Sequence, residues 1–110
     1  MEQDLFVKIK HINRALDQRF PNGQEPFQIM TRLLEECGEL AQQVHHFEGS
    51  GVKRHKHGEP SKAHFAKGVQ DVLRCILQLV DYYQIEPELL TSVDQSHQRA
   101  IAQIGEQNNA

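Results

Sequence analysis

Hydrophobic positions recur at steps of three and four residues along almost the whole chain, and this spacing predicts helices. The predicted helices cover approximately residues 5–20, 26–48, 61–83 and 87–104. Pro21 ends the first segment, Pro26 suits the first turn of the second, and Gly105 is typical of a C-terminal cap after the fourth. Because no alternating β-branched run is present, the sequence predicts an all-α fold without a sheet.

The second predicted helix has two neighbouring apolar stripes. The first stripe contains Phe27, Met30, Leu34, Cys37, Ala41 and Val44, and the second contains Ile29, Leu33, Leu40 and Phe47. So wide an apolar arc indicates contact with more than one neighbour. We therefore expect helices 26–48 and 61–83 to form an antiparallel hairpin, which completes a four-helix bundle by pairing with a second subunit. The expected assembly is a homodimer or a dimer of dimers.

Length and composition favour one small domain. The chain has 110 residues, 38% of them hydrophobic, and we expect a single domain over residues 1–110. A formal charge of -3 argues against general nucleic-acid binding, and no apolar run is long enough for a membrane span. Cys37 and Cys75 lack zinc-site and disulfide-framework spacings, which favours a reducing compartment. These features predict a cytoplasmic protein without a membrane partner.

Acidic residues interrupt the apolar pattern at the middle of the hairpin. Glu36 falls within the second stripe, Glu39 lies one turn later, and Asp71 is placed similarly in the facing helix. Buried carboxylates repel one another and cost several kcal/mol each unless a cation pairs with them. Oxygen ligands favour Mg²⁺, with Mn²⁺ as the alternative, so we interpret Glu36, Glu39 and Asp71 as a metal site. The competing interpretation is a run of solvated helix acids, and Gly38 within the run predicts close backbone packing.

A basic segment connects the two acid-bearing helices. Residues 49–62 contain four lysines and arginines but one acid, although the chain as a whole is acidic. Such a segment is a candidate lid over bound phosphates, and the alternative is a solvated loop. The candidate phosphate-binding residues are Lys53, Arg54, Lys56, Arg74 and Arg99.

Two segments resemble the MazG-like family of all-α nucleoside triphosphate pyrophosphohydrolases. RLLEECGELAQQV resembles the E-E-x-x-E helix of that family, and KGVQDVLRCILQLVDYYQIEPELL resembles its E-x-x-D helix followed by a short break and another helix. The similarity extends from about Phe27 to Arg99. It implies Mg²⁺-dependent hydrolysis of the α–β phosphoanhydride of a nucleoside triphosphate, which gives a nucleoside monophosphate and pyrophosphate in nucleotide-pool housekeeping.

The resemblance also implies roles for individual residues. The metal ligands of the family fall on Glu36, Glu39 and Asp71. Glu35 is implied as a further ligand or as a base that orients the attacking water, so Glu35 and Glu36 are the candidate catalytic residues.

One family ligand has no counterpart in this chain. Gly68 stands where the E-x-x-D motif has its glutamate. We hypothesise that His64, four residues earlier on the same helical face, or an extra water fills the vacant position; the simpler interpretation is that His64 is a solvated first-turn residue. The alternative function is a catalytically impaired, nucleotide-binding or regulatory dimeric helical module.

Overall fold

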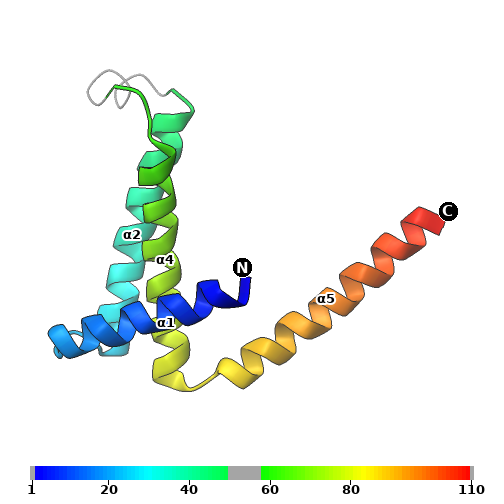
Figure 1. The fold of residues 1–110 in the computed structure, drawn as a ribbon, viewed down its shortest axis with the longest axis horizontal. Helices are drawn as coiled ribbons and strands as arrows, with labels where there is room; N and C mark the ends of the chain where they lie inside the picture. Colours follow the sequence, from blue (N-terminus) through cyan, green and yellow to red (C-terminus); the bar gives the residue numbers. More distant parts are fainter. Residues whose placement is uncertain (1, 50–57, 110) are drawn as a thin grey trace. The chain divides into compact units, whose positions relative to one another are not determined.

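The computed structural model describes residues 2–49 and 58–109, together with the side chains of residues 5–49 and 58–106. Its helices are α1 (Glu2–Arg19), α2 (Pro26–Phe47), α4 (Lys62–Tyr83) and α5 (Glu86–Asn109), and the described residues contain no strand (Figure 1). The predicted all-α fold with four helices is therefore confirmed. None of these helices, within the described ranges, is long and apolar enough to cross a membrane.

The helix ends follow local sequence signals with one exception. Pro26 occupies the first turn of α2, where its missing N–H is not needed, and the N–H of Glu25 donates to Oε1 of Gln28 at 3.3 Å in a capping box. The predicted stop at Gly105 is wrong, because α5 continues to Asn109. A helical glycine costs only about 1 kcal/mol relative to alanine, which does not outweigh continued helix formation through Glu106.

The chain divides into two compact units, Met1–Leu79 and Val80–Ala110, and the division falls within α4. The first unit contains α1, α2 and most of α4. The second unit contains the last turn of α4 and α5. The prediction of one domain over residues 1–110 remains a prediction.

In the first unit α2 and α4 lie side by side as the expected antiparallel hairpin, and α1 crosses it (Figure 1). Each of the three helices contributes one nearly inaccessible hydrophobic side chain: Ile9 is 3% exposed, Ile29 is 2% exposed and Cys75 is 0% exposed. Because three helices share this small core, the hairpin and α1 stabilise one another.

Polar contacts fix α1 and its turn to the hairpin. Nδ2 of buried Asn13 donates to the backbone carbonyl of Arg74 at 3.1 Å. Arg32 of α2 donates from Nη1 to the carbonyl of Gly23 at 3.0 Å and from Nη2 to Oε1 of Gln78 at 3.3 Å. Gly23 has a φ of 90°, which favours glycine at this turn. Arg32 therefore joins the turn after α1 to both helices of the hairpin.

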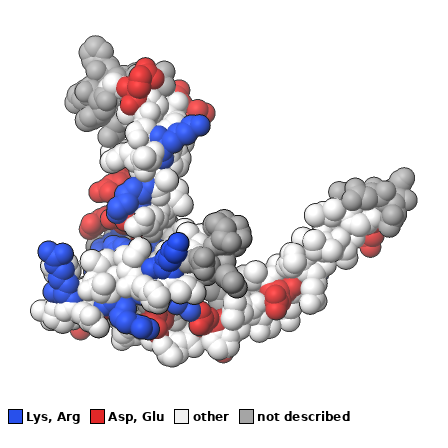
Figure 2. All heavy atoms as spheres, viewed as in Figure 1, with Lys and Arg blue, Asp and Glu red and all other residues white. Residues whose placement is uncertain are grey.

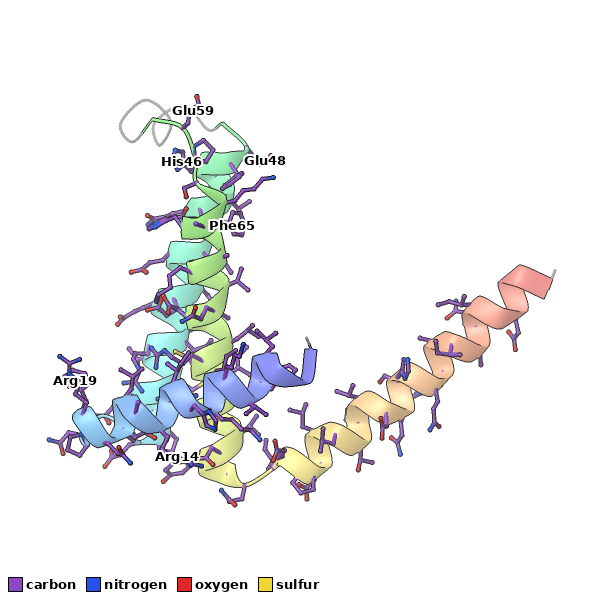
Figure 3. The ribbon with its side chains drawn as sticks, viewed as in Figure 1. Arg14, Arg19, His46, Glu48, Glu59 and Phe65 are labelled. Carbon is purple, nitrogen blue, oxygen red and sulfur yellow. The ribbon has the colours of Figure 1, made fainter. Side chains whose placement is uncertain are left out.

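Aromatic and imidazole contacts close the other end of the hairpin. The rings of Phe47 and Phe65 meet edge to face with centroids 5.0 Å apart, which is a favourable geometry for aromatic pairs. His46 is buried, and its Nε2 donates to the backbone carbonyl of Gly58 at 2.7 Å (Figure 3). These contacts fix α2 and α4 next to each other immediately before and after residues 50–57.

The two apolar stripes of α2 differ in exposure. The inner stripe comprises buried Ile29 and half-buried Leu33, Leu40 and Phe47. The outer stripe comprises Phe27, Met30, Leu34, Cys37, Ala41 and Val44, all of them exposed. The prediction of close packing at Gly38 is wrong within this chain, because an added Cβ would meet nothing within 4 Å. Gly38 instead lies in open space, one residue beyond Cys37 of the outer stripe.

The second unit contains little besides α5. At the end of α4, Gln84 has a φ of 54°, and the N–H of Ile85 donates to the carbonyl of Val80 at 3.1 Å. The described side chains of α5 are exposed up to Ile104, including Leu90 at 61%. Among the described residues of this unit, α5 is the one long helix, and its side chains up to Ile104 pack into no hydrophobic core there.

Candidate metal site

The candidate site lies at the middle of the hairpin, where α2 and α4 face each other. Glu36 falls within the inner stripe of α2, four residues before Leu40. On α4, Gly68 faces the same stripe, because an added Cβ would lie 3.5 Å from Cδ1 of Leu40. Asp71 follows Gly68 by three residues and precedes buried Cys75 by four, so it lies along the packed face of α4.

The electrostatics of Glu36 show which groups are its neighbours. Burial raises the pKa of Glu36, and the negative charges of Glu39 and Asp71 raise it further. Arg74 and Lys67 oppose this shift, because their positive charges lower the pKa of Glu36. On the face shown in Figure 2, acidic and basic side chains lie next to one another over α2 and α4. Glu36, Glu39 and Asp71 thus interact through space, and we refer to them as the carboxylate cluster.

Lys67 is a member of the site that the sequence analysis missed. Its Nζ forms an ion pair with Oδ1 of Asp71 at 2.7 Å, across one turn of α4. The side chain of Asp71 is 21% exposed and that of Lys67 is 59% exposed, so the ion pair lies at the edge of the packed face. The spacing of four residues between Lys67 and Asp71 was the available signal, since such side chains are neighbours on a helix.

The remaining predicted acidic and histidine residues are more exposed. Glu35 and Glu39 are exposed on α2, whereas Glu36 is half-buried. His64 is exposed in the first turn of α4, where its backbone N–H donates to Oγ of Ser61 at 3.2 Å, as the simpler interpretation expects. Among the described residues, no three His, Cys, Asp or Glu side chains form a group that could hold a metal ion as they stand. The predicted ligand set therefore remains a prediction.

The candidate phosphate-binding residues are distributed over different parts of the chain. Lys53, Arg54 and Lys56 lie outside the described residues. Arg74 is half-buried in the first unit, and its positive charge acts on Glu36. Arg99 belongs to α5 in the second unit, where its Nε donates to the carbonyl of Gln95 at 3.3 Å. Among these cations, only Arg74 is thus shown next to the carboxylate cluster.

Comparison of the chain with protein-family models, curated proteins and solved structures finds no match. The resemblance to MazG-like enzymes accordingly stays a prediction from the sequence motifs. The arguments for function depend on the residues of the hairpin and their chemistry.

Proposed function

We propose that the chain is a Mg²⁺-dependent nucleoside triphosphate pyrophosphohydrolase, which converts a nucleoside triphosphate and water into a nucleoside monophosphate and pyrophosphate. The observation that carries the proposal is the half-buried Glu36, with Glu39 and Asp71 close enough to raise its pKa. A protein gains no stability from gathering like charges in this way. A divalent cation would remove the repulsion, and carboxylate oxygens are suitable ligands for Mg²⁺ or Mn²⁺.

The proposed roles are those that the sequence resemblance implies. Glu36, Glu39 and Asp71 would hold the metal, and exposed Glu35 would orient water or serve as a further ligand. Bound Mg²⁺ would stabilise the negative charge that develops on the phosphates and the leaving group. Arg74 would attract the phosphates, since its positive charge already acts at Glu36. Lys53, Arg54, Lys56 and Arg99 remain further candidates for phosphate contacts.

Gly68 favours a second candidate function, a catalytically impaired nucleotide-binding or regulatory module. This residue faces Leu40 of α2 and has no side chain to offer a ligand. Asp71 is then the single α4 carboxylate in the cluster, and it is already paired with Lys67. Nucleotide binding without hydrolysis would result if the remaining ligands held the metal too loosely for catalysis.

The Gly68→Glu variant tests these two functions. The backbone of Gly68 is helical, and the 3.5 Å contact of an added Cβ with Leu40 is an ordinary van der Waals distance, so this position accommodates a Cβ atom. We expect the variant to release pyrophosphate roughly 10–100-fold faster than the natural chain, because it regains a ligand. Pyrophosphate is measured over a panel of standard and modified triphosphates, with Mg²⁺ or Mn²⁺.

Gly68→Ala is the matched control, since it adds a side chain at the same place without a carboxylate. It should leave the rate of pyrophosphate release unchanged and raise the free energy of unfolding by about 1 kcal/mol, the usual gain for alanine over glycine in a helix. If neither the natural chain nor Gly68→Glu hydrolyses any triphosphate of the panel, the proposed pyrophosphohydrolase function is contradicted. Calorimetric binding of a triphosphate with metal, without turnover, would support the regulatory module.

We further propose that the outer stripe of α2 forms the interface of a homodimer. Its members follow one another at alternating steps of three and four residues from Phe27 to Val44, which is the spacing of a helix-packing seam. Phe27 is 85% exposed and Leu34 is 66% exposed, which is unfavourable in water. The open space beside Gly38 would allow a second helix to approach closely. A dimer of dimers would need a second interface. The exposed apolar residues of α5 are the candidates for it.

A further inference from the structure

The outer stripe of α2 is symmetric in its spacing. From Phe27 to Val44 its residues follow one another at steps of three, four, three, four and three, so the pattern is the same from either end. Its midpoint lies between Glu35 and Glu36. Two copies of α2 that run in opposite directions and meet at this midpoint would place each residue of one stripe opposite a residue of the other. Two copies that run in the same direction would place each residue opposite itself.

Side-chain size divides the outer stripe into two halves. The N-terminal half contains the larger residues Phe27, Met30 and Leu34, and the C-terminal half contains the smaller residues Cys37, Ala41 and Val44. All of them are exposed. In the C-terminal half there is also open space beside Gly38, because an added Cβ would meet nothing within 4 Å. One half of the stripe therefore protrudes, and the other half has room for side chains of a second helix.

An antiparallel pair of α2 helices would combine a larger with a smaller residue in every layer. The facing pairs are Phe27 with Val44, Met30 with Ala41, and Leu34 with Cys37. The distance between two packed helices depends on the side chains at the contact, so such layers allow a constant distance. A parallel pair would place Phe27 against Phe27 and Ala41 against Ala41. Its axes would diverge at one end, or cavities would remain at the other, and both are unfavourable.

Charges beside the outer stripe do not oppose this pairing. The flanking positions are Pro26, Leu33 and Leu40 on one side, and Thr31, Gly38 and His45 on the other. In coiled coils these positions often carry acids, lysines or arginines, which determine the orientation of the partner. Here none of them does, so the fit of the side chains along the stripe decides between the two orientations.

We propose that two copies of α2 pair in antiparallel orientation through the outer stripe, about a twofold axis between Glu35 and Glu36. The larger residues of each copy pack into the smaller-residue half of the other, and Leu34 enters the open space beside Gly38 of the second copy. The inference rests on the homodimer proposed above and adds its orientation and register. It does not depend on the carboxylate cluster.

Disulfide cross-linking tests the orientation. In a Cys37→Ala background, which removes the exposed thiol and leaves buried Cys75, Phe27→Cys and Val44→Cys are prepared separately and then mixed. Mild oxidation should link the two variants to each other in the mixture and neither variant to itself, because facing positions come within disulfide distance. Mass spectrometry identifies the linked species. Gln42→Cys mixed with Phe27→Cys is the control and should give no link, since Gln42 lies outside the stripe.

A double-mutant cycle tests the register. Met30→Ala should weaken dimerisation about tenfold, because it leaves a cavity in the interface, and Ala41→Met should weaken it by a similar factor through overpacking. The double variant exchanges the larger and the smaller residue, so it should dimerise within about threefold of the natural chain. Within one copy the two positions lie eleven residues apart, or about 16 Å along the helix. Such a departure from additivity therefore requires contact between copies. Sedimentation equilibrium gives the dissociation constants.

The outcomes separate the orientation from the homodimer itself. Cross-linking in the mixture alone, together with recovery in the double variant, supports the antiparallel pair. If the natural chain dimerises but Phe27→Cys links to itself, or if the factors for Met30→Ala and Ala41→Met simply multiply in the double variant, the antiparallel register is overturned and the homodimer stands. If the natural chain is monomeric at all concentrations while circular dichroism shows it folded, the homodimer is overturned, and the orientation with it.

Discussion

The inner stripe of α2 is buried or half-buried within the first unit, whereas the outer stripe of the same helix is exposed. Both stripes are built from large apolar residues at helical spacing, so hydrophobicity does not distinguish them. They differ in their neighbours, because α1 and α4 cover one side of α2 and leave the other uncovered (Figure 1). The carboxylate of Glu36 lies on the covered side. The comparison indicates that one face of α2 is used to build the fold, whereas the exposed face is the one on which the proposed dimer interface lies.

The largest expected effect is on the free energy of unfolding, and substitutions on the two stripes should change it by different amounts. Ile29→Ala should lower the free energy of unfolding by about 2–5 kcal/mol, because it leaves a cavity around a side chain that is 2% exposed. Phe27→Ala should change it by about 0.5 kcal/mol or less, since Phe27 is 85% exposed. Urea denaturation at low protein concentration, where association does not contribute, measures both. Equal losses for the two variants would show that the stripes do not differ as described.

A charge on the outer stripe should have the next largest effect, on association. Leu34→Lys is expected to weaken dimerisation about 30-fold or more, because a central apolar residue of an interface often contributes about 2 kcal/mol. Gln42→Lys adds the same charge to an exposed position of α2 outside the stripe and should leave association unchanged. Sedimentation equilibrium gives the dissociation constants. A natural chain that stays monomeric at all concentrations, or equal behaviour of the two variants, would reject the interface.

The smallest expected effect concerns Glu36 on the inner stripe. Because its pKa is raised in the folded protein above the usual 4.5, ionisation of Glu36 opposes folding. The stabilising contribution of the protonated form is complete below the usual pKa and is lost as the pH rises through the raised value. Glu36→Gln should therefore increase the free energy of unfolding by about 0.5 kcal/mol near neutral pH, as expected from relief of a like-charge pair, and should have no effect near pH 4.

Urea denaturation in the presence of a chelator, at the two pH values, measures this difference. Glu48→Gln serves as the control, since Glu48 is an exposed acid just after α2 and lies near the end of the hairpin (Figure 3). A Glu36→Gln variant that is less stable than the natural chain near neutral pH would show that the carboxylate has stabilising partners. The cluster would then not need a metal ion to compensate its charge.

The helices could be predicted from the sequence because a spacing of three and four residues is a local property. The end of α5 could not be predicted, since a glycine such as Gly105 disfavours a helix only weakly. Two apolar stripes were also visible on α2, but which of them the chain covers depends on where α1 crosses. The placement of Glu36 near Asp71 followed from the apolar pattern of both helices. The ion pair between Lys67 and Asp71 was not predicted, although their spacing of four residues makes them neighbours on a helix.

The two cysteines differ in chemical reactivity as a result of the same packing. Cys75 is 0% exposed, and burial raises the pKa of its thiol, although Arg74 and Arg32 oppose the shift. A thiol that is inaccessible and protonated does not react with alkylating reagents, whereas Cys37 is exposed on the outer stripe. A maleimide fluorophore should therefore label the unaltered chain at one position. Since that position lies on the proposed interface, its rate of labelling would report on assembly without any substitution.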